Sequence, residues 1–451
     1  MAGRGVRIGR GRNEPTPGAR LPAVHRRPLC RARKDSRRRA SSCREVRVKL
    51  DTQALRVAVF SDNDFGKTNG VTTTWRAVLS QTDASQSVRI YTASDAAVEQ
   101  PDYLSVASFG VGLPWYREMR IYLPAVRRFM RQVVNDGITV VHVATPGPVG
   151  LAGRWIARRA GLPLVGSYHT ELGEYARLLS GSARLGRTLD DYMRWFYEPC
   201  ASLLAPSYAT ARQLRSQGYR DEQLRVWLRG VDADRFSPDR RSTTLRRNWG
   251  VDDRRPVILY AGRLSAEKGL DLVPRIQQFL HRRAIAHRFV FAGDGPMRAD
   301  LQRHLPDAVF MGSLPHAQVA EVMASADVFL FPSATDTFGN VVLEAQASGI
   351  PVVVSDRGGP CQQIRPGVTG EVCRADDAES FAIALARLLR DRAWRTHMGD
   401  AARQLARDRP WDQALRPLFD AWDDANRLSA GATPAAASTS TSVIVETRRA
   451  S

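Results

Sequence analysis

Short apolar runs recur along the chain, and segments with helical spacing separate them. In the first half of the chain such runs occupy residues 55–61, 88–92, 139–143 and 164–167. Runs with little polar alternation are typical of strands that are buried on both faces of a parallel sheet. The alternation of strands and helices over residues 55–235 therefore predicts one doubly wound, Rossmann-like α/β domain.

The same alternation starts again after residue 236. Further apolar runs lie at residues 257–260, 289–292, 309–312, 329–332 and 350–355. We therefore predict a second Rossmann-like domain over residues 236–410, and the fold class is α/β with two doubly wound domains facing each other across a cleft. Residues 411–428 have the pattern of a last helix that returns to the first domain.

Residues 116–134 have the spacing of an amphipathic helix. Its apolar face holds Met119, Tyr122, Val126, Phe129 and Val133, and arginines crowd the other faces. We expect Pro124 to kink this helix. A basic amphipathic helix can lie on an anionic membrane surface, but a domain helix with a solvated arginine face explains the pattern equally well.

Charge is distributed unevenly over the 451 residues. The net charge is +20, and residues 1–50 alone contribute +13, with 16 Lys and Arg against three acidic residues. We predict that residues 1–54 are a disordered basic extension and that residues 429–451, rich in Ala, Ser and Thr, are a disordered tail. The extension could bind nucleic acid or anionic lipid. Its lack of interleaved aromatic residues favours an accessory segment without a specific nucleic-acid partner.

Cysteine usage and hydropathy indicate an intracellular protein. The five cysteines are scattered without a CxxC pair, which argues against a disulfide framework and against a structural zinc site. Since the sequence contains no apolar run of about 18 residues, we predict no membrane-spanning helix. Since the N-terminus lacks an apolar core segment, we predict no secretory signal.

The stretch from Phe331 to Gly359 predicts a strand–loop–helix–strand unit with a candidate anion site. Phe338, Gly339 and Asn340 lie where the helix begins, and the N–H groups of a helix opening suit a phosphate. Asp336 precedes this opening, and Glu344 lies about one turn into the helix. The two carboxylates could accept hydrogen bonds from sugar hydroxyls on either side of a diphosphate. A capping Asp and a solvated Glu are the alternative explanation.

Three further candidates follow other predicted strands. Arg263 and Lys268 lie five residues apart in a Gly-flanked loop, where a planar guanidinium and a mobile ammonium suit a diphosphate. Gly70 follows the first strand at an Asn-Gly turn, and His169 lies at the carboxyl end of a strand, where open α/β sheets place ligands. Surface cations, an ordinary tight turn and a structural histidine are the alternatives.

At this point the chain resembles the retaining glycosyltransferases of family 4, which have the GT-B fold. The resemblance spans residues 55–425 and rests on five motifs, each at a predicted strand end: Asn69-Gly70-Val71, Tyr168-His169-Thr170, AGRLSAEKG, AGDGP and TDTFGNVVLEAQASG. The Thr-Asp-Thr-Phe-Gly-Asn loop is most similar to that of bacterial GDP-mannose-dependent α-mannosyltransferases and sulfolipid-synthase-like relatives.

The resemblance implies a role for each candidate residue. Gly70 would let the backbone approach the donor phosphate, and Arg263 with Lys268 would neutralise the diphosphate. The N–H groups of Phe338, Gly339 and Asn340 would add donors to it. Glu344 would bind the ribose, Asp336 the hydroxyls of the transferred sugar, and His169 the sugar near its reacting carbon. The family usually has Glu where Asp336 stands, so the shorter side chain leaves the sugar preference open.

The resemblance further implies hexose transfer, with mannose from GDP-mannose as the preferred reading and a UDP-sugar as the other donor. The acceptor would be a glycolipid or glycan, no metal or other cofactor would take part, and the protein would be cytoplasmic, with a peripheral contact at the inner membrane face through its basic surface. A nucleotide-sugar epimerase of the same fold and a basic nucleic-acid-binding protein remain alternatives. A Rossmann dehydrogenase is disfavoured because no GxGxxG follows either first strand.

Overall fold

The computed structural model describes residues 54–66, 69–82, 86–113, 116–252 and 254–431. The expected extension over residues 1–54 and the expected tail over residues 429–451 lie almost entirely outside the described residues. Residues 429–431 are an exception, because they continue the last helix and do not begin the tail.

The first sheet has the strand order β10-β9-β8-β7-β1-β2-β4-β3. Its neighbouring strands run parallel, apart from β3, which pairs antiparallel with β4. The strands are β1 (Leu55–Phe60), β2 (Gln86–Ser94), β3 (Val98–Glu99), β4 (Tyr103–Ala107), β7 (Val140–Val143), β8 (Leu164–Ser167), β9 (Ser202–Ala205) and β10 (Leu224–Val226).

Helices from both ends of the chain accompany this sheet. They are α1 (Gly70–Gln81), α2 (Val126–Asn135), α3 (Pro148–Ala160), α4 (Leu172–Ser180), α5 (Ala183–Tyr197) and α6 (Tyr208–Ser216), joined by α14 (Trp411–Ala414) and α15 (Arg416–Gly431). Leu415 separates the last two helices, although its backbone stays in the right-handed helical region (φ −84°, ψ −15°). Leu418 and Trp422 of α15 are fully buried in one apolar cluster with Val57 of β1 and Trp75 of α1.

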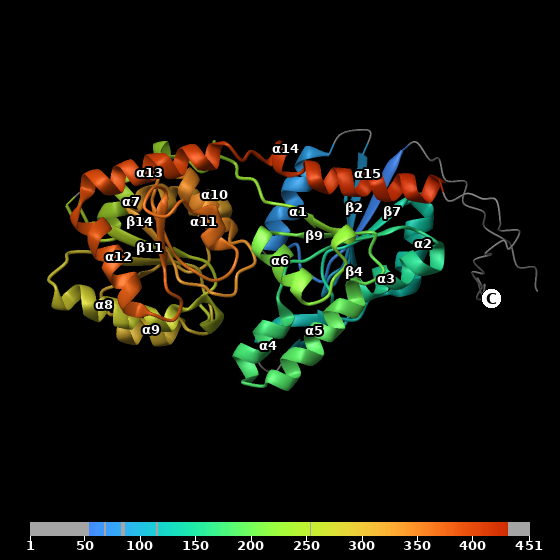
Figure 1. Ribbon diagram of the computed structural model, residues 1–451, viewed down its shortest axis with the longest axis horizontal. Coiled ribbons are helices and arrows are strands. Elements are labelled where there is room, and N and C mark those ends of the chain that lie inside the picture. The colour runs from blue at the N-terminus through green and yellow to red at the C-terminus, as the bar shows by residue number, and fades with distance from the viewer. Residues whose placement is uncertain (1–53, 67–68, 83–85, 114–115, 253, 432–451) are drawn as a thin grey trace, which may run out of the picture. The chain divides into compact units, whose positions relative to one another are not determined.

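The second sheet has the order β13-β12-β11-β14-β15-β16 and is parallel throughout. Its strands are β11 (Val257–Ala261), β12 (Arg288–Ala292), β13 (Val309–Phe310), β14 (Val328–Phe331), β15 (Val352–Ser355) and β16 (Gly370–Cys373). Its helices, several of which surround β11 and β14 in Figure 1, are α7 (Thr243–Asn248), α8 (Val273–Arg282), α9 (Arg298–His304), α10 (His316–Ser325), α11 (Asn340–Ala347), α12 (Ala378–Arg390) and α13 (Arg392–Arg407).

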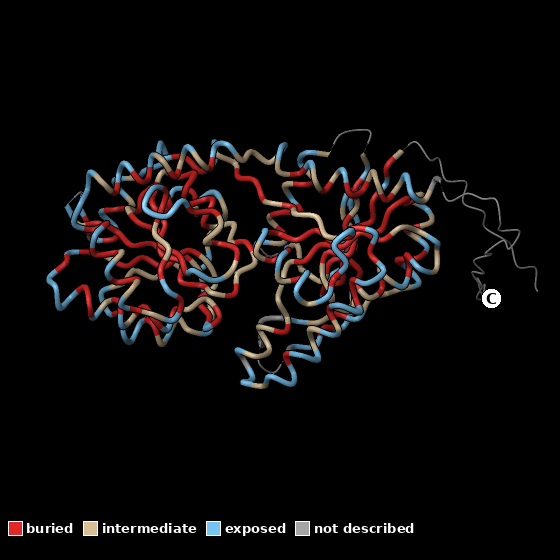
Figure 2. Tube along the Cα trace, in the orientation of Figure 1, coloured by how far each residue is buried: buried red, intermediate tan, exposed pale blue. Residues whose placement is uncertain are grey.

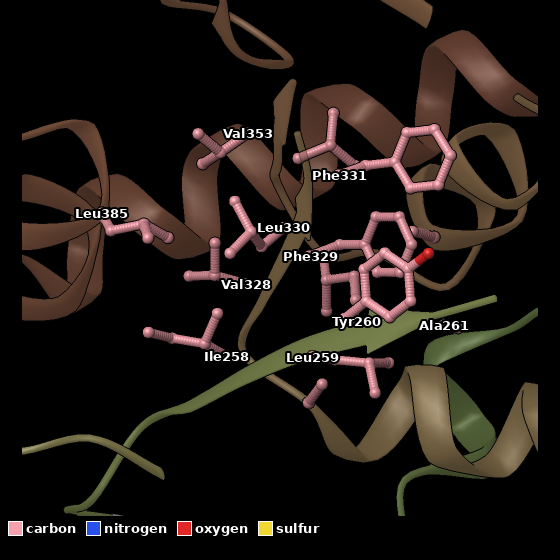
Figure 3. Packing of buried hydrophobic residues seen from close by; sticks show 14 of the residues in the cluster. Ile258, Leu259, Tyr260, Ala261, Val328, Phe329, Leu330, Phe331, Val353 and Leu385 are labelled. Carbon is pink, nitrogen blue, oxygen red and sulfur yellow. The ribbon is translucent and has the colours of Figure 1, made fainter. Parts of the chain in front are cut away.

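The central strands of both sheets are buried apart from a few positions such as the exposed Arg56 of β1, while the helices alternate between buried and exposed faces (Figure 2). Every residue of β11 and of β14 is buried, which agrees with the uninterrupted apolar runs in the sequence. Aromatic rings fill the space beside these strands: Tyr260 of β11 stacks on Phe331 of β14 with their ring centroids 6.1 Å apart (Figure 3). This packing fixes the strand ends from which the candidate loops leave.

The helix predicted over residues 116–134 is wrong in its first part. Residues Tyr116–Tyr122 form strand β6, which pairs antiparallel with β5 (Gly110–Leu113), and only α2 is helical. Pro124 lies between β6 and α2 and does not kink a continuous helix. The residue before a proline is driven out of the helical region, so Pro124 is a boundary here, although the apolar spacing continues across it.

In each sheet the chain first adds strands on one side of the starting strand and then switches to its other side. From β1 the chain adds β2 and β4 on one side and β7 to β10 on the other. From β11 it adds β12 and β13 on one side and β14 to β16 on the other. Open α/β sheets bind ligands outside the carboxyl ends of the strands at such a switch point. The loops after β1, β11 and β14 are therefore the places to look for a site.

Candidate active site

The sequence-predicted residues lie in the loops at these switch points. Gly70 follows β1, Arg263 and Lys268 follow β11, and Asp336 lies between β14 and α11. Hydrogen bonds join loops that are far apart in the sequence. Asn340 Nδ2 donates to the carbonyl of Gly70 (3.2 Å), and Thr337 Oγ1 donates to the carbonyl of His169 (3.1 Å).

The opening of α11 is uncapped. Its N-cap residue is Gly339 with φ +80°, a left-handed conformation that favours glycine, and within the described residues no side chain caps the helix. The first N–H groups of an α-helix have no partner inside the helix and carry the positive end of its dipole. The opening therefore offers backbone donors to an anion, as the sequence predicts for residues 338–340.

The loop before α11 is held from behind by residues 358–363. The N–H of Gly359 donates to the carbonyl of Asp336 (2.8 Å), and Gln363 Nε2 donates to the carbonyls of Phe338 and Gly339. A Cβ at Gly359 would lie 1.9 Å from the Thr337 carbonyl oxygen, so only glycine allows this close approach. The opening is thus preorganised in the free protein.

Lys268 and Asp336 form an ion pair beside this opening. The ammonium lies 2.9 Å from both carboxylate oxygens, and the two side chains are only 15% and 19% exposed. Burial acts to lower the pKa of Lys268, but the facing Asp336 carboxylate outweighs it and holds that pKa above its usual value. In the free protein Lys268, which we predict to bind the phosphate, is therefore paired with Asp336, which we predict to bind the sugar.

Arg263 occupies the loop between β11 and the 3₁₀ turn η3 (Ala266–Lys268). The hydroxyl of Tyr260 donates to its carbonyl oxygen (2.8 Å), and the N–H of Gly262 bonds to the carbonyl of Ala292 (2.9 Å). These bonds fix the start of the loop. Arg263 is half-buried, and both Arg263 and Lys268 lie in the segment that follows the carboxyl end of β11.

Glu344 of α11 accepts a hydrogen bond from a histidine that sequence reasoning missed. His316 Nε2 lies 3.0 Å from Glu344 Oε1, and Arg235 Nη1 lies 3.1 Å from His316 Nδ1. A guanidinium can only donate, so Nδ1 of His316 accepts and Nε2 carries the hydrogen that Glu344 receives. Only 10% of the Glu344 side chain is exposed. The Glu344 carboxylate, which we predict to bind the ribose, is thus already oriented in the free protein.

Gly70 begins α1, and this helix opening is capped. The side chain of Asn69 accepts hydrogen bonds from the N–H groups of Val71 and Thr72, both at 3.0 Å. A Cβ at Gly70 would make an ordinary 3.7 Å contact with Asn340 Nδ2, so the free protein does not itself require glycine here. The opening of α1 therefore offers fewer backbone donors than the opening of α11.

His169 follows β8 and is half-buried. Its Nε2 lies 2.9 Å from Ser167 Oγ, and its Nδ1 lies 3.4 Å from Arg229 Nη2. Burial lowers the pKa of His169 well below its usual value, and the positive charge of Arg229 lowers it further. The ring is neutral at physiological pH and is already hydrogen-bonded through both nitrogens.

Several site residues escaped the sequence analysis. His316 and Arg229 were visible only as single polar residues in loops, and Tyr175 of α4 was not singled out. Burial raises the pKa of Tyr175, whose phenol lies within electrostatic range of Lys268 and Asp336. The available signal was position, because His316 follows the predicted strand over residues 309–312 and Arg229 lies shortly after β10. Their partners are distant in the sequence, so spacing alone could not assign them.

Polar loops at the switch points of two Rossmann-like sheets, with paired cations and carboxylates around an uncapped helix, are the arrangement of a GT-B glycosyltransferase. Two family models match the chain: Glycosyltransferase Family 4 over residues 68–235 and Glycosyl transferases group 1 over residues 241–405. The chain belongs to this family of glycosyltransferases. The predicted family, fold class and enzyme class are thereby confirmed.

Among curated relatives, a GDP-mannose-dependent alpha-mannosyltransferase of Mycobacterium tuberculosis is 35% identical over 307 residues, which cover 68% of this chain and 75% of the relative. A protein of the same name from Corynebacterium glutamicum is 29% identical over 383 residues, covering 83% and 90%. The solved structure of Anabaena HepE with UDP-glucose has a TM-score of 0.63 at 18% identity and covers 84% of this chain and 98% of HepE. That likeness concerns the fold.

Proposed function

We propose that the protein transfers mannose from GDP-mannose to a hydroxyl group of a glycolipid or glycan, with retention of the anomeric configuration. The observation that carries this proposal is the uncapped, preorganised opening of α11, flanked by the Lys268–Asp336 pair on one side and by Glu344 on the other. The choice of mannose and GDP follows the relatives named GDP-mannose-dependent mannosyltransferases.

In this proposal the diphosphate of the donor lies at the opening of α11. The N–H groups there, with Arg263 and Lys268, stabilise the negative charge that grows as the sugar leaves. Lys268 turns from Asp336 toward the phosphate, and Asp336 then accepts hydrogen bonds from the hydroxyls of the sugar. Glu344, oriented by His316, accepts hydrogen bonds from the ribose hydroxyls.

The bond that breaks joins the anomeric carbon to the β-phosphate oxygen, and the bond that forms joins the same carbon to the acceptor oxygen. We place the attack on the face from which the diphosphate departs, and the acceptor proton passes to the departing phosphate oxygen. The protein contributes preorganised donors and positive charge at the leaving group. Removing one such donor lowers the rate by on the order of 10²–10³.

A lipid acceptor would bring the protein to a membrane surface. Arg127, Arg128 and Arg131 of α2 are exposed, and so is Leu123 just before this helix (64% exposed). Basic and apolar side chains together favour a peripheral contact with anionic lipid at the inner membrane face, with the protein otherwise in the cytoplasm. Among the described residues, no helix has the length and apolarity that a membrane crossing requires. Co-sedimentation with vesicles of neutral and of anionic lipid tests this contact.

We further propose that transfer proceeds without a metal ion, because Arg263, Lys268 and the helix opening can neutralise the diphosphate. Initial rates measured with and without excess EDTA test this part of the proposal. Equal rates are expected. A rate that falls with EDTA and returns with Mg²⁺ or Mn²⁺ would show that a cation takes part.

The donor is tested by offering the purified full chain GDP-mannose, UDP-glucose and UDP-galactose with a lipid extract as acceptor. Mass spectrometry identifies the product, and the anomeric coupling constant in its NMR spectrum reports retention. We expect product from GDP-mannose alone. Product from a UDP-sugar would reassign the donor, and conversion of a donor without any acceptor would indicate the epimerase alternative.

A further inference from the structure

A buried chain of hydrogen bonds runs from helix α15 to His169. The indole Nε1 of Trp422 lies 2.9 Å from His142 Nδ1, and His142 Nε2 lies 3.0 Å from Ser167 Oγ. Ser167 Oγ lies 2.9 Å from His169 Nε2, and Arg229 Nη2 lies 3.4 Å from His169 Nδ1. Trp422, His142 and Ser167 are fully buried, and Arg229 is 2% exposed.

The two ends of this chain fix the position of each hydrogen. An indole N–H and a guanidinium can only donate, so Nδ1 of His142 and Nδ1 of His169 must both accept. Each ring is neutral, because burial lowers both pKa values, that of His142 to about 3. A neutral ring that accepts at Nδ1 carries its hydrogen at Nε2. Both histidines therefore donate to Ser167 Oγ, and each ring is held in one tautomer.

Arg229, which ends this series of hydrogen bonds, is a buried cation. Its guanidinium lies 3.8 Å from the centre of the Trp227 ring, and its Nη1 donates to the Trp227 carbonyl (2.6 Å). Among the described residues, no carboxylate forms an ion pair with it. Burial without a counter-charge lowers the pKa of Arg229 to about 9. The contacts of this guanidinium are the Trp227 ring, the Trp227 carbonyl and Nδ1 of His169.

The position of His169 connects this chain to the proposed donor site. Its carbonyl oxygen accepts the hydroxyl of Thr337, the residue between Asp336 and the uncapped opening of α11. We propose that Arg229 is a positioning residue for sugar transfer: with Ser167, His142 and Trp422 behind the ring, it holds neutral His169 in one tautomer and in contact with the loop that precedes α11. This inference rests on the proposed function.

A neutral His169 would favour transfer because positive charge develops on the sugar during the reaction. The resemblance to family 4 implies that His169 contacts the sugar near its reacting carbon. In this proposal an imidazolium there would lie next to a glycosyl cation and raise the barrier, so the neutral ring is the competent form. The charged or titratable groups that act on His169 are Arg229 and His142, and both disfavour the imidazolium. With Arg229 in place, His169 stays neutral at acidic pH. Without this cation, the pKa of His169 rises toward its usual value, and the competent form is lost at a higher pH.

The experiment compares the pH dependence of the wild type with Arg229→Met and Arg229→Lys. In Arg229→Met we expect the acid limb of kcat/KM to move up by on the order of one pH unit, so that the rate below this limb falls about tenfold. Arg229→Lys keeps the charge and should restore most of the wild-type profile. Arg154→Met is the matched control, because Arg154 also lies over an indole ring, that of Trp195, and donates to its carbonyl.

A readout that does not need activity separates this inference from the proposed function. Histidine ¹⁵N shifts, with His169 assigned through His169→Asn, report the tautomer and the pKa of the ring. We expect an unprotonated Nδ1 in the wild type and a higher pKa in Arg229→Met, with Arg229→Gln as a second variant that also removes the charge should Arg229→Met unfold. If His169 titrates identically in the wild type and in the folded variants that lack the charge, the inference is wrong. If it titrates as expected but GDP-mannose gives no product, only the proposed function fails.

Discussion

The openings of α1 and α11 meet through the side chain of Asn340 but are built in opposite ways. Asn340, at the opening of α11, donates to the carbonyl of Gly70, at the opening of α1. At α1, Asn69 closes the opening with its own side chain and forms a capping box with Thr72. At α11, glycine in a left-handed conformation replaces the cap. In our proposal the capped opening serves folding, whereas the uncapped one keeps its donors for the diphosphate.

The contacts that hold each helix opening in place also differ. Trp75 of α1 packs against His142, Trp227 and Trp422, so α1 rests on a buried aromatic cluster. The loop of α11 rests on backbone bonds from residues 358–363 and on the Lys268–Asp336 pair. One opening is anchored by apolar burial and the other by polar contacts. The following variants separate these two kinds of support.

Lys268→Met is expected to have the largest effect. It removes a cation beside the uncapped opening and leaves Asp336 buried without its partner. Transfer should slow by on the order of 10²–10³. Lys268→Arg keeps the charge and should lose less. Initial rates with saturating donor test this, alongside thermal unfolding of each variant. A loss below tenfold would remove Lys268 from the proposed chemistry.

Acid should weaken the buried cluster that supports α1. The folded pKa of His142 is about 3, below its usual 6.5, so the unfolded chain takes up the proton first. Stability is therefore fully present above pH 6.5 and is lost as the pH falls toward 3. Between pH 7 and pH 5 this loss is about 2 kcal/mol.

Denaturant unfolding at pH 7 and at pH 5 measures this term. His142→Gln should show a smaller difference between the two pH values than the wild type, whatever its absolute stability. His304→Gln is the control, because His304 is exposed. Equal pH dependence in the wild type and His142→Gln would show that His142 does not control the acid sensitivity of this cluster.

Gly339→Ala tests the uncapped opening directly. Alanine at φ +80° costs roughly 1–2 kcal/mol and displaces the first N–H groups of α11. Donor binding should weaken about tenfold, which corresponds to about 1.4 kcal/mol. Gly349→Ala is the matched control, because Gly349 has φ +75° at the other end of the same helix. Calorimetric titration should separate the two variants. Equal donor affinities would assign the effect of Gly339 to backbone strain alone.

Asn69→Ala is expected to have the smallest effect. Loss of the cap should cost about 1 kcal/mol of stability. Donor KM should change less than twofold, because in our proposal the diphosphate lies at α11. Denaturant unfolding and donor KM, measured on the same preparation, check both halves of this prediction. If Asn69→Ala weakens the donor more than Gly339→Ala does, the roles of the two openings are reversed.

The sequence analysis located most of the strands but misread one segment and missed a helical pair. β11 and β14 were visible because every residue in them is buried, which leaves an uninterrupted apolar run. β6 was taken for helix because apolar residues kept helical spacing across Pro124. The hairpin of α4 and α5 was not predicted. It contributes Tyr175, a neighbour of Lys268 and Asp336.

What the sequence by itself determined is the alternation of strands and helices and the polar loops that end the strands. These follow from local periodicity, because each residue's burial depends on the face its own element presents to the core. The roles assigned to Gly70, His169, Arg263, Asp336 and Glu344 stay predictions. The structure places His169, Arg263 and Asp336 in loops after strands, Gly70 at the start of α1 and Glu344 in α11.

Only the tertiary structure decided which polar groups are partners. Lys268 meets Asp336 68 residues away, and Trp422 reaches His142 across 280 residues. A buried polar group must find a partner, but the order of the strands and the side on which each helix packs determine which one it finds. Sequence spacing does not contain that information. For this reason the sequence indicated only the loops of the site. The folded chain showed that α1 is capped, that α11 is uncapped, and that Ser167 and Arg229 hydrogen-bond the ring of His169.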